Sequence, residues 1–430
     1  MKNINPGDFV ELIFPNKSYK GILLESPKDE KGVILLKLDS GYNIGFKKKD
    51  ISEIRLIKKA EKKEEKIEIK IPQEKPKIAM IITGGTIASK LDTKTGAVSP
   101  LTKPEEFFKF YPKIFDKVSL EKIIVPFTKA SEDMDFKDWK KIAKITYNLL
   151  NNKEIKGVII THGTDTLHYT ASALSFFLQN LNKPVILTYS QRSIDRASSD
   201  ANLNLQCSAL ASISDIAEVL LVGHATMNDD FCFAILGTKA RKLHTSRRDA
   251  FKSVNRKPIA KIWPDKIEIL SEHKLRNEKN KVKLDAKFNN KVALIKFYPG
   301  QNPDILEFYH KNKYEGLVIE ATGLGHVSSL SKNSFLKKIK KLTKDGIIVC
   351  VTSQCIYGRV DPYVYSNGRE LEKAGAIFLE DMLSETAFVK LGWILGHKEW
   401  KKNKQIIKQK MLTNFAGEIN ERLDEQFHSL

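Results

Sequence analysis

From Lys77 onwards, short runs of apolar and β-branched residues alternate with longer stretches of helical periodicity. The first series of runs is Ile78–Ile82, Val158–Ile160, Val185–Thr188 and Val219–Val222, and Asp138–Leu150 is one of the helical stretches between them. Such alternation predicts a parallel, doubly wound sheet with helices on both faces. A second series follows a polar stretch and comprises Val292–Phe297, Leu317–Glu320, Ile347–Val351 and Ala376–Leu379. The sequence therefore predicts two α/β domains, a larger one over residues 78–271 and a smaller one over 291–430, joined by a linker at 272–290.

The first 57 residues have a different texture, because short alternating segments are separated there by turn residues such as Asp39-Ser40-Gly41. This spacing is typical of a small antiparallel β-barrel, and we expect an SH3-like barrel over residues 1–57. Residues 58–77 are rich in lysine and glutamate and close with Pro72 and Pro76, which predicts a charged, extended linker. A chain of 430 residues is long enough for several such folded units.

The chain carries 72 lysine and arginine residues against 52 acidic ones, which gives a net charge of +20. Such a charge attracts polyanions such as nucleic acid, but a lysine-rich solvated surface explains it equally well. Basic runs such as Lys398–Lys410 have no interleaved aromatic residues of the kind that stack on bases. The charge alone therefore leaves both interpretations open.

Three further classes of feature are not expected from the sequence. No run approaches the ~20 apolar residues of a membrane span, and the N-terminus has no apolar signal-peptide core, so we expect a cytoplasmic protein without membrane contact. The four cysteines and nine histidines show no spacing of metal ligands, so we expect no protein-bound metal.

The first predicted strand runs directly into Thr83-Gly84-Gly85-Thr86-Ile87-Ala88. Ligands of open parallel sheets bind at the carboxyl ends of strands, so this turn indicates a site. Its glycines would let backbone N–H groups approach a developing oxyanion, and threonine offers a hydroxyl nucleophile. A tight turn or a phosphate-binding loop is the alternative, although the motif matches neither a Walker loop nor Gly-x-Gly-x-x-Gly.

A second turn of this kind, Thr161-His162-Gly163-Thr164-Asp165-Thr166, follows the strand candidate Val158–Ile160 and places a hydroxyl beside a carboxylate. Two such turns in one sheet can face each other where the strand order reverses. A hydroxyl nucleophile needs a base, and a desolvated lysine can serve as one. The chain has many lysines, however, and spacing alone does not select among them.

These two turns, together with Ala130-Ser131-Glu132-Asp133-Met134 and Thr226-Met227-Asn228-Asp229, resemble the signatures of the bacterial-type L-asparaginase family. The resemblance covers roughly residues 77–430 and implies the asparaginase pair of α/β domains. It also implies an amidohydrolase that acts through a threonine acyl-enzyme.

The resemblance assigns roles to individual positions. The catalytic residues that it implies are the primary nucleophile Thr86 and a second threonine–lysine–aspartate group of Thr164, Lys242 and Asp165. Ser131 and Asp165 would hold the α-carboxylate and α-amino ends of the substrate, with Gly85 as a further substrate-binding residue.

One branch of this family resembles the chain more than the others do. Ordinary asparaginases begin close to the first threonine motif, whereas a barrel and a linker precede it here. The stretches that are similar to the GatD branch, the glutaminase subunits of archaeal glutamyl-tRNA(Gln) amidotransferases, are Leu38–Gly45, Arg241–Phe251, Tyr357–Val360 and Glu380–Ala387.

Membership of this branch would imply glutamine as the amide donor and a GatE-type partner that uses ATP and Mg²⁺ to activate glutamate on tRNA. Glu-tRNA(Gln) would be reached through the complex, in which this chain would form a homodimer within a heterotetramer. This chain itself would bind no cofactor.

Two alternative functions remain, a free-standing L-asparaginase or glutaminase with an added barrel, and a catalytically silent scaffold that docks RNA. The full set of Thr86, Thr164, Asp165 and Lys242 argues against a silent scaffold. We also expect the loop Lys90–Pro100 to act as a lid. Relatives carry a tyrosine there, but this sequence has none between Ile87 and Phe110, and we expect Thr93 in its place.

Overall fold

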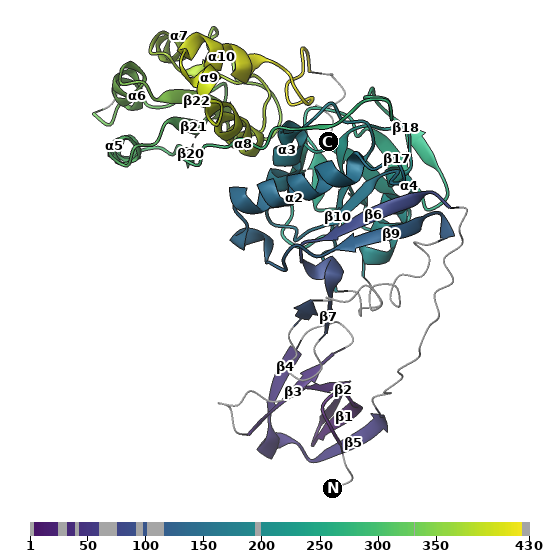
Figure 1. Ribbon diagram of the computed structural model, residues 1–430. Coiled ribbons are helices and arrows are strands. Elements are labelled where there is room, and N and C mark those ends of the chain that lie inside the picture. Colours follow the sequence, from purple (N-terminus) through teal and green to yellow (C-terminus); the bar gives the residue numbers. More distant parts are fainter. Residues whose placement is uncertain are drawn as a thin grey trace.

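The computed structural model describes residues 4–24, 32–38, 43–59, 75–91, 98–100, 116–193, 199–330 and 332–423. It contains an N-terminal antiparallel sheet followed by two α/β domains (Figure 1). Residues 60–74, which make up most of the predicted charged linker, lie outside the described residues.

The N-terminal sheet consists of β1 (Phe9–Phe14), β2 (Lys17–Leu24), β3 (Val33–Lys37), β4 (Asn43–Lys47) and β5 (Glu53–Lys58), with a 3₁₀ turn η1 (Lys48–Asp50) before the last strand. The strands are antiparallel in the order β4-β3-β2-β1-β5, as expected for a small β-barrel domain. Val10, Leu12 and Leu36 are fully buried and form its core. Val10 and Leu12 alternate with less buried neighbours along β1, which is the period-two pattern of a half-buried strand.

The large domain is built on one eight-stranded sheet. Its strands are β6 (Lys77–Ile82), β9 (Ser119–Ile124), β10 (Val158–Thr161), β12 (Val185–Thr188), β13 (Val219–His224), β14 (Cys232–Leu236), β17 (Ala260–Ile262) and β18 (Ile267–Ile269). The order is β18-β17-β14-β13-β12-β10-β6-β9. Strands β6, β9, β10, β12 and β13 pair in parallel, whereas β14, β17 and β18 each pair antiparallel with their neighbours. Because β6 lies between β9 and β10, the winding reverses between β6 and β10, and the carboxyl ends of these two strands form the switch point where ligands bind in such sheets.

Helices cover both faces of this sheet, and they are α2 (Phe136–Leu150), α3 (Leu167–Phe177) and α4 (Ala201–Ser212). Alternate residues of β6 point to opposite faces, so Ala79 and Ile81 share a core with α2 and α3, whereas Ile78 and Met80 share one with α4. Strands that are buried on both faces appear in the sequence as continuous apolar runs, which is why the central strands could be predicted.

Within the described residues, three pairs of short strands lie outside the larger sheets. They are β7 (Ser89–Leu91) with β8 (Val98–Pro100), β11 (Leu178–Gln179) with β19 (Lys283–Leu284), and β15 (Ala240–Lys242) with β16 (Phe251–Ser253). The β7–β8 pair follows the 3₁₀ turn η2 (Thr86–Ala88) and belongs to the predicted lid. The predicted lid residue Thr93 lies outside the described residues.

The small domain is a parallel sheet of β20 (Val292–Lys296), β21 (Gly316–Ala321), β22 (Ile348–Ser353) and β23 (Ile377–Phe378), paired in chain order. Its helices are α5 (Asp304–Lys311), α6 (Phe335–Lys344), α7 (Ser366–Lys373), α8 (Ser384–Leu395), α9 (Lys398–Lys401) and α10 (Lys404–Leu412). The strand order never reverses, so the crossover helices α5, α6 and α7 pack together on one face. Helices α8 and α10 cover the other face, which also joins the core of the large domain.

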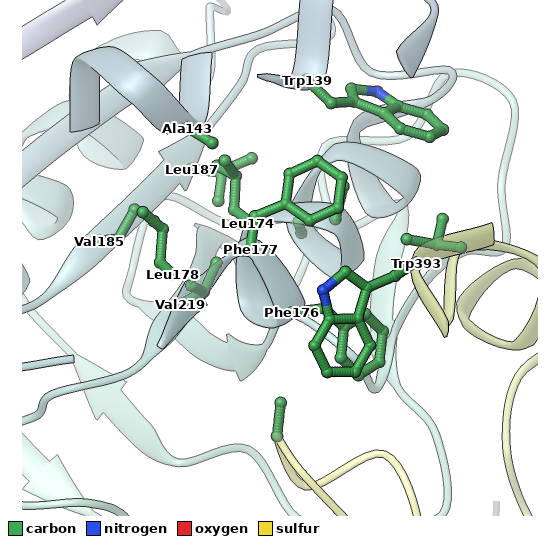
Figure 2. Packing of buried hydrophobic residues seen from close by; sticks show 14 of the residues in the cluster. Trp139, Ala143, Leu174, Phe176, Phe177, Leu178, Val185, Leu187, Val219 and Trp393 are labelled. Atoms are coloured by element: carbon green, nitrogen blue, oxygen red, sulfur yellow. The ribbon is translucent and has the colours of Figure 1, made fainter. Parts of the chain in front are cut away.

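The two α/β domains share one hydrophobic core. Phe176 of α3 stacks on Trp393 of α8 with ring centroids 5.5 Å apart, and Figure 2 shows the two side chains between the domains. The segment 272–290, predicted as a linker, contributes Phe288, whose ring meets Trp139 of α2 edge to face at 5.7 Å. This segment is therefore packed into the interface rather than merely spanning it.

A buried ion pair also joins the domains. The Nζ of Lys239 lies 2.6 Å from Oδ2 of Asp381, and both side chains are fully buried. Asp381 additionally accepts hydrogen bonds from the backbone N–H and the side-chain amide of Asn420, at 2.9 and 2.7 Å. Burial lowers the pKa of Lys239, and the Asp381 carboxylate counteracts this shift.

Replacing Asp381 by alanine is expected to lower the free energy of unfolding by about 3–5 kcal/mol, because a buried ammonium would lose its counter-ion. Urea unfolding followed by circular dichroism measures this change. The control is Glu370→Ala, which removes a surface partner of Lys373 at 3.2 Å and should leave the midpoint unchanged, since that pair is 70% and 55% exposed. Equal midpoints for the two variants would contradict the expected role of Asp381.

Candidate active site

The two threonine motifs meet backbone to backbone at the switch point. Thr83 donates from both its N–H and its hydroxyl to the carbonyl oxygen of Thr161, at 3.2 and 2.8 Å. Gly85 has a φ of +83°, and a Cβ on it would lie only 2.5 Å from the backbone nitrogen of Gly163. Only glycine tolerates this φ and this approach together, so Gly85 is the residue that allows the two turns to touch.

A third segment closes around them. The backbone N–H of Lys129 donates to the carbonyl oxygen of Thr83 at 3.0 Å. Ser131 follows in the 3₁₀ turn η4 (Ser131–Asp133) and is buried. Its hydroxyl accepts a 3.2 Å hydrogen bond from the Asp165 N–H, and its carbonyl oxygen accepts a 2.6 Å bond from the Thr166 hydroxyl. The two residues predicted to bind the ends of the substrate, Ser131 and Asp165, are therefore direct neighbours.

Lys242 reaches this group from the β15–β16 pair. Its Nζ donates to Oγ1 of Thr164 at 2.8 Å and to Oδ1 of Asp165 at 2.7 Å. The lysine side chain is 10% exposed, whereas that of Asp165 is 63% exposed. The amino group is thus enclosed between a hydroxyl and a carboxylate, while the carboxylate also faces solvent and remains accessible to a ligand.

Thr86 is half-buried in η2, immediately after Gly85. In the part of the chain that the structure describes, no hydrogen bond joins its hydroxyl to Thr164 or Lys242. The structure thus brings Gly85, Ser131, Thr164, Asp165 and Lys242 into one group, to which Thr86 is connected as the residue after Gly85. Catalytic contacts of free enzymes commonly tighten only when substrate is bound, so this geometry is compatible with a nucleophile.

Two histidines near this group were not singled out in the sequence. His162 shares hydrogen bonds with the Gly163 carbonyl and the Thr170 hydroxyl, at 2.7 and 2.8 Å. Burial lowers the pKa of His162 to about 4. Burial, with the positive charges of Arg241 and Lys242, lowers the pKa of His168 to about 3. Both rings are therefore neutral at neutral pH, and neither adds a positive charge beside Lys242.

The residue beside Lys242 connects the site to the small domain. Arg241 forms an ion pair with Glu385 of α8. The two residues belong to Arg241–Phe251 and Glu380–Ala387, stretches that the sequence singled out as similar to one branch of the asparaginase family. The structure places these two stretches in contact, although 144 positions separate the paired residues.

One groove on the described surface lies away from these motifs. It has a volume of about 670 Å³ and is lined by residues such as Lys77, Lys156 and Asp215, at the amino ends of the parallel strands. Ligands of such sheets bind at the opposite ends, so we assign the site to the threonine motifs. Among the described residues, no cluster of histidine, cysteine and acidic side chains is suited to a metal ion, and no helix is long and apolar enough to cross a membrane.

The chain is similar to known proteins along most of its length. Family models match the chain as "Asparaginase, N-terminal" at residues 77–275, "Glutaminase/Asparaginase C-terminal domain" at 291–409 and "GatD N-terminal domain" at 4–57. The structure of the thermostable L-asparaginase from Thermococcus kodakarensis superposes with a TM-score of 0.72 at 28% identity, covering 80% of this chain and 100% of that chain.

Two curated proteins are similar over nearly the whole length. The D subunit of glutamyl-tRNA(Gln) amidotransferase from Pyrococcus furiosus is 47% identical over 97% of this chain and 95% of its own length. The corresponding D subunit from Thermococcus kodakarensis is 48% identical over 94% of this chain and 90% of its own. Both asparaginase domains and the GatD N-terminal domain are matched, and the identity to these D subunits extends over nearly the whole chain, so the chain belongs to the family of glutamyl-tRNA(Gln) amidotransferase D subunits.

Proposed function

We propose that this chain is the glutaminase subunit of a glutamyl-tRNA(Gln) amidotransferase. It hydrolyses glutamine to glutamate and ammonia, and a partner subunit uses the ammonia to convert Glu-tRNA(Gln) to Gln-tRNA(Gln). The observation that carries the proposal is the hydrogen-bonded group of Thr164, Asp165 and Lys242 at the turn that Gly85, the residue before Thr86, approaches closely. Similarity to D subunits over 97% of the chain, against 80% for a free asparaginase, favours this function over a free-standing enzyme.

In the first half of the reaction, Oγ1 of Thr86 attacks the side-chain carbonyl carbon of glutamine. Lys242 in its amine form accepts the hydroxyl proton, directly or through the Thr164 hydroxyl to which it is hydrogen-bonded. Backbone N–H groups of the glycine turn that contains Gly85 stabilise the negative oxygen of the tetrahedral intermediate. The proton then passes to the leaving nitrogen, the carbon–nitrogen bond breaks, and ammonia departs.

The second half returns the enzyme to its starting state. A water molecule gives a proton to Lys242 and attacks the γ-glutamyl ester on Thr86. The ester bond breaks, the Thr86 oxygen takes back a proton, and glutamate leaves. Throughout, the exposed carboxylate of Asp165 binds the α-ammonium of the substrate, and Ser131 binds its α-carboxylate.

The acceptor half of the reaction is assigned to a GatE-type partner. That subunit would bind ATP and Mg²⁺ and activate the glutamate on tRNA, so this chain needs neither. In the complex, this chain forms a homodimer within a heterotetramer. The complex is located in the cytoplasm with its tRNA substrate. The presence of all the residues of an acyl-transfer site argues against the silent RNA-docking scaffold.

Purification of the chain with a co-expressed GatE-type partner tests this function. We expect a stable complex that forms Gln-tRNA(Gln) from Glu-tRNA(Gln), glutamine and ATP, with one glutamate released for each amide transferred. With free ammonia added, the partner alone should form Gln-tRNA(Gln) in the absence of both glutamine and this chain. Rapid glutamine or asparagine hydrolysis by the isolated chain, unaffected by partner and tRNA, would instead identify a free-standing amidohydrolase.

A further inference from the structure

The strand pair that carries Lys242 is not part of either large sheet. β15 and β16 form only three residue pairs, in which Lys242 lies opposite Phe251. So short a ladder does not by itself hold a side chain in place. The position of Lys242 must therefore be set by what the hairpin touches, and the ring of Phe251 packs against that of Tyr189 with centroids 4.7 Å apart.

The turn of this hairpin, residues 243–250, is anchored at Arg248. Nη1 of Arg248 donates to Oδ2 of Asp229 at 2.9 Å and to the carbonyl oxygen of Met227 at 3.3 Å. The backbone carbonyl oxygen of Arg248 accepts a 3.0 Å hydrogen bond from the Tyr189 hydroxyl. The turn is thus held through both the side chain and the backbone of Arg248.

Asp229 and Tyr189, the two residues that hold Arg248, are also connected to each other by a chain of hydrogen bonds. The second carboxylate oxygen of Asp229 lies 2.9 Å from Nε2 of His224, whose Nδ1 lies 2.6 Å from Oδ1 of Asn204. The Asn204 amide nitrogen donates to the carbonyl oxygen of Tyr189 at 2.9 Å. Tyr189, Asn204, His224, Asp229 and Arg248 therefore form a closed circle of hydrogen bonds, which we call the hairpin clamp.

His224 is the central member of the hairpin clamp. Its side chain is fully buried, and both of its ring nitrogens face oxygen atoms. The amide of Asn204 uses its nitrogen toward Tyr189, so its oxygen can only accept from His224, and the carboxylate of Asp229 also only accepts. His224 thus links the amide of Asn204 to the carboxylate of Asp229 through its two ring nitrogens.

The charges around Asp229 agree with this arrangement. Burial alone would raise the pKa of Asp229, but the hydrogen bond from His224 and the charge of Arg248 outweigh it, and the pKa is lowered. A second tie runs parallel to the clamp, because Nζ of Lys252 donates to the carbonyl oxygen of Ala225 at 3.2 Å. The loop after β13 thus binds the hairpin at two residues, Arg248 and Lys252.

We propose that His224, Asp229 and Arg248 are positioning residues for the glutaminase reaction, acting through the hairpin clamp to keep Lys242 in place. This inference rests on the proposed function, in which Lys242 transfers protons. The bonds from Lys242 to Thr164 and Asp165 measure 2.8 and 2.7 Å, so a shift of about 1 Å would break both. Misplacement of this size can cost roughly 100-fold in rate.

The expected kinetic signature is specific. Ser131, Asp165 and Gly85 lie outside the clamp, so Asp229→Ala and His224→Ala should lower kcat about 10- to 100-fold while leaving the KM for glutamine within about threefold. Arg248→Lys keeps a single positive donor toward Asp229 and should recover most of the kcat that Arg248→Met loses. In the double variant of Asp229→Ala and Arg248→Met the two losses should not add, because both break the same contact.

The assay measures glutamate release by the complex with its partner and acceptor tRNA, with melting temperatures recorded for every variant. Asp230→Ala is the matched control, since Asp230 is the exposed neighbour of Asp229 in the same loop, and it should behave as wild type. The proposal is overturned if Asp229→Ala keeps the wild-type kcat. It is also overturned if the KM for glutamine rises by the same factor by which kcat falls and the melting temperature drops as well. A wild-type complex without activity would refute the proposed function itself, whereas an inactive Lys242→Ala beside a fully active Asp229→Ala would refute only the clamp.

Discussion

Replacing Thr86 by alanine is expected to reduce glutamine hydrolysis by roughly 10⁴-fold or more, because the acyl-enzyme cannot form without a nucleophilic hydroxyl. Thr86 is half-buried directly after Gly85, so removal of its hydroxyl and methyl group leaves the backbone contact between the two motifs in place. Glutamine should still bind, since Ser131 and Asp165 are untouched. The loss should therefore appear in kcat and not in the melting temperature.

Thr86→Ser is the matched variant, because it keeps the oxygen and removes only the methyl group. Substantial activity in the serine variant and none in the alanine variant would identify the hydroxyl as the reacting group. Mass spectrometry of the wild-type enzyme, quenched during turnover, should detect a glutamyl ester on the peptide that contains Thr86. Ammonia release by Thr86→Ala at the wild-type rate would remove Thr86 from the mechanism.

Replacing Lys242 is expected to have an effect of similar size, about 10³-fold or more in kcat, because the site would lose its proton acceptor. Lys242→Arg separates two possible roles of this side chain. Arginine keeps the positive charge and can still donate to Thr164 and Asp165, but it stays protonated and cannot act as a base.

We therefore expect Lys242→Arg to be nearly as inactive as Lys242→Ala while keeping a melting temperature closer to that of the wild type. Measurement of kcat, KM and melting temperature for both variants decides the matter. If the arginine variant hydrolysed glutamine normally, Lys242 would be an electrostatic anchor for Asp165, and another group would have to move the proton.

Much of the large domain could be predicted from the sequence, because its central strands are buried on both faces. Val158–Thr161 and Val185–Thr188 consist of such residues, and both are strands in the structure. The antiparallel strands β17 and β18 have only three residues each, too few to show a periodicity. The position of β6 between β9 and β10 could not be predicted either, since pairing between distant segments leaves no local pattern.

The candidate site, too, could be predicted from the sequence only in part. That Thr83–Ala88 and Thr161–Thr166 would face each other followed from their places after parallel strands, and the structure confirms the contact. Lys242 was identified only by resemblance, because it lies 78 positions from Thr164 on a strand pair outside the main sheet. His224 had no sequence signal, since a lone histidine at a strand end acquires its role only from partners that the fold brings to it. The role of each of these residues in catalysis stays a prediction.

The shared core between the α/β domains has a consequence for how the enzyme can be divided. Phe176 and Trp393 come from different domains, yet each is almost completely buried, and each would be exposed if the other half were absent. A chain truncated before β20 would keep Thr86, Thr164 and Lys242. It would, however, expose a large aromatic surface to solvent, and we expect it to aggregate. The two halves should accordingly unfold in a single cooperative transition, and neither is a natural unit for recombination with another enzyme.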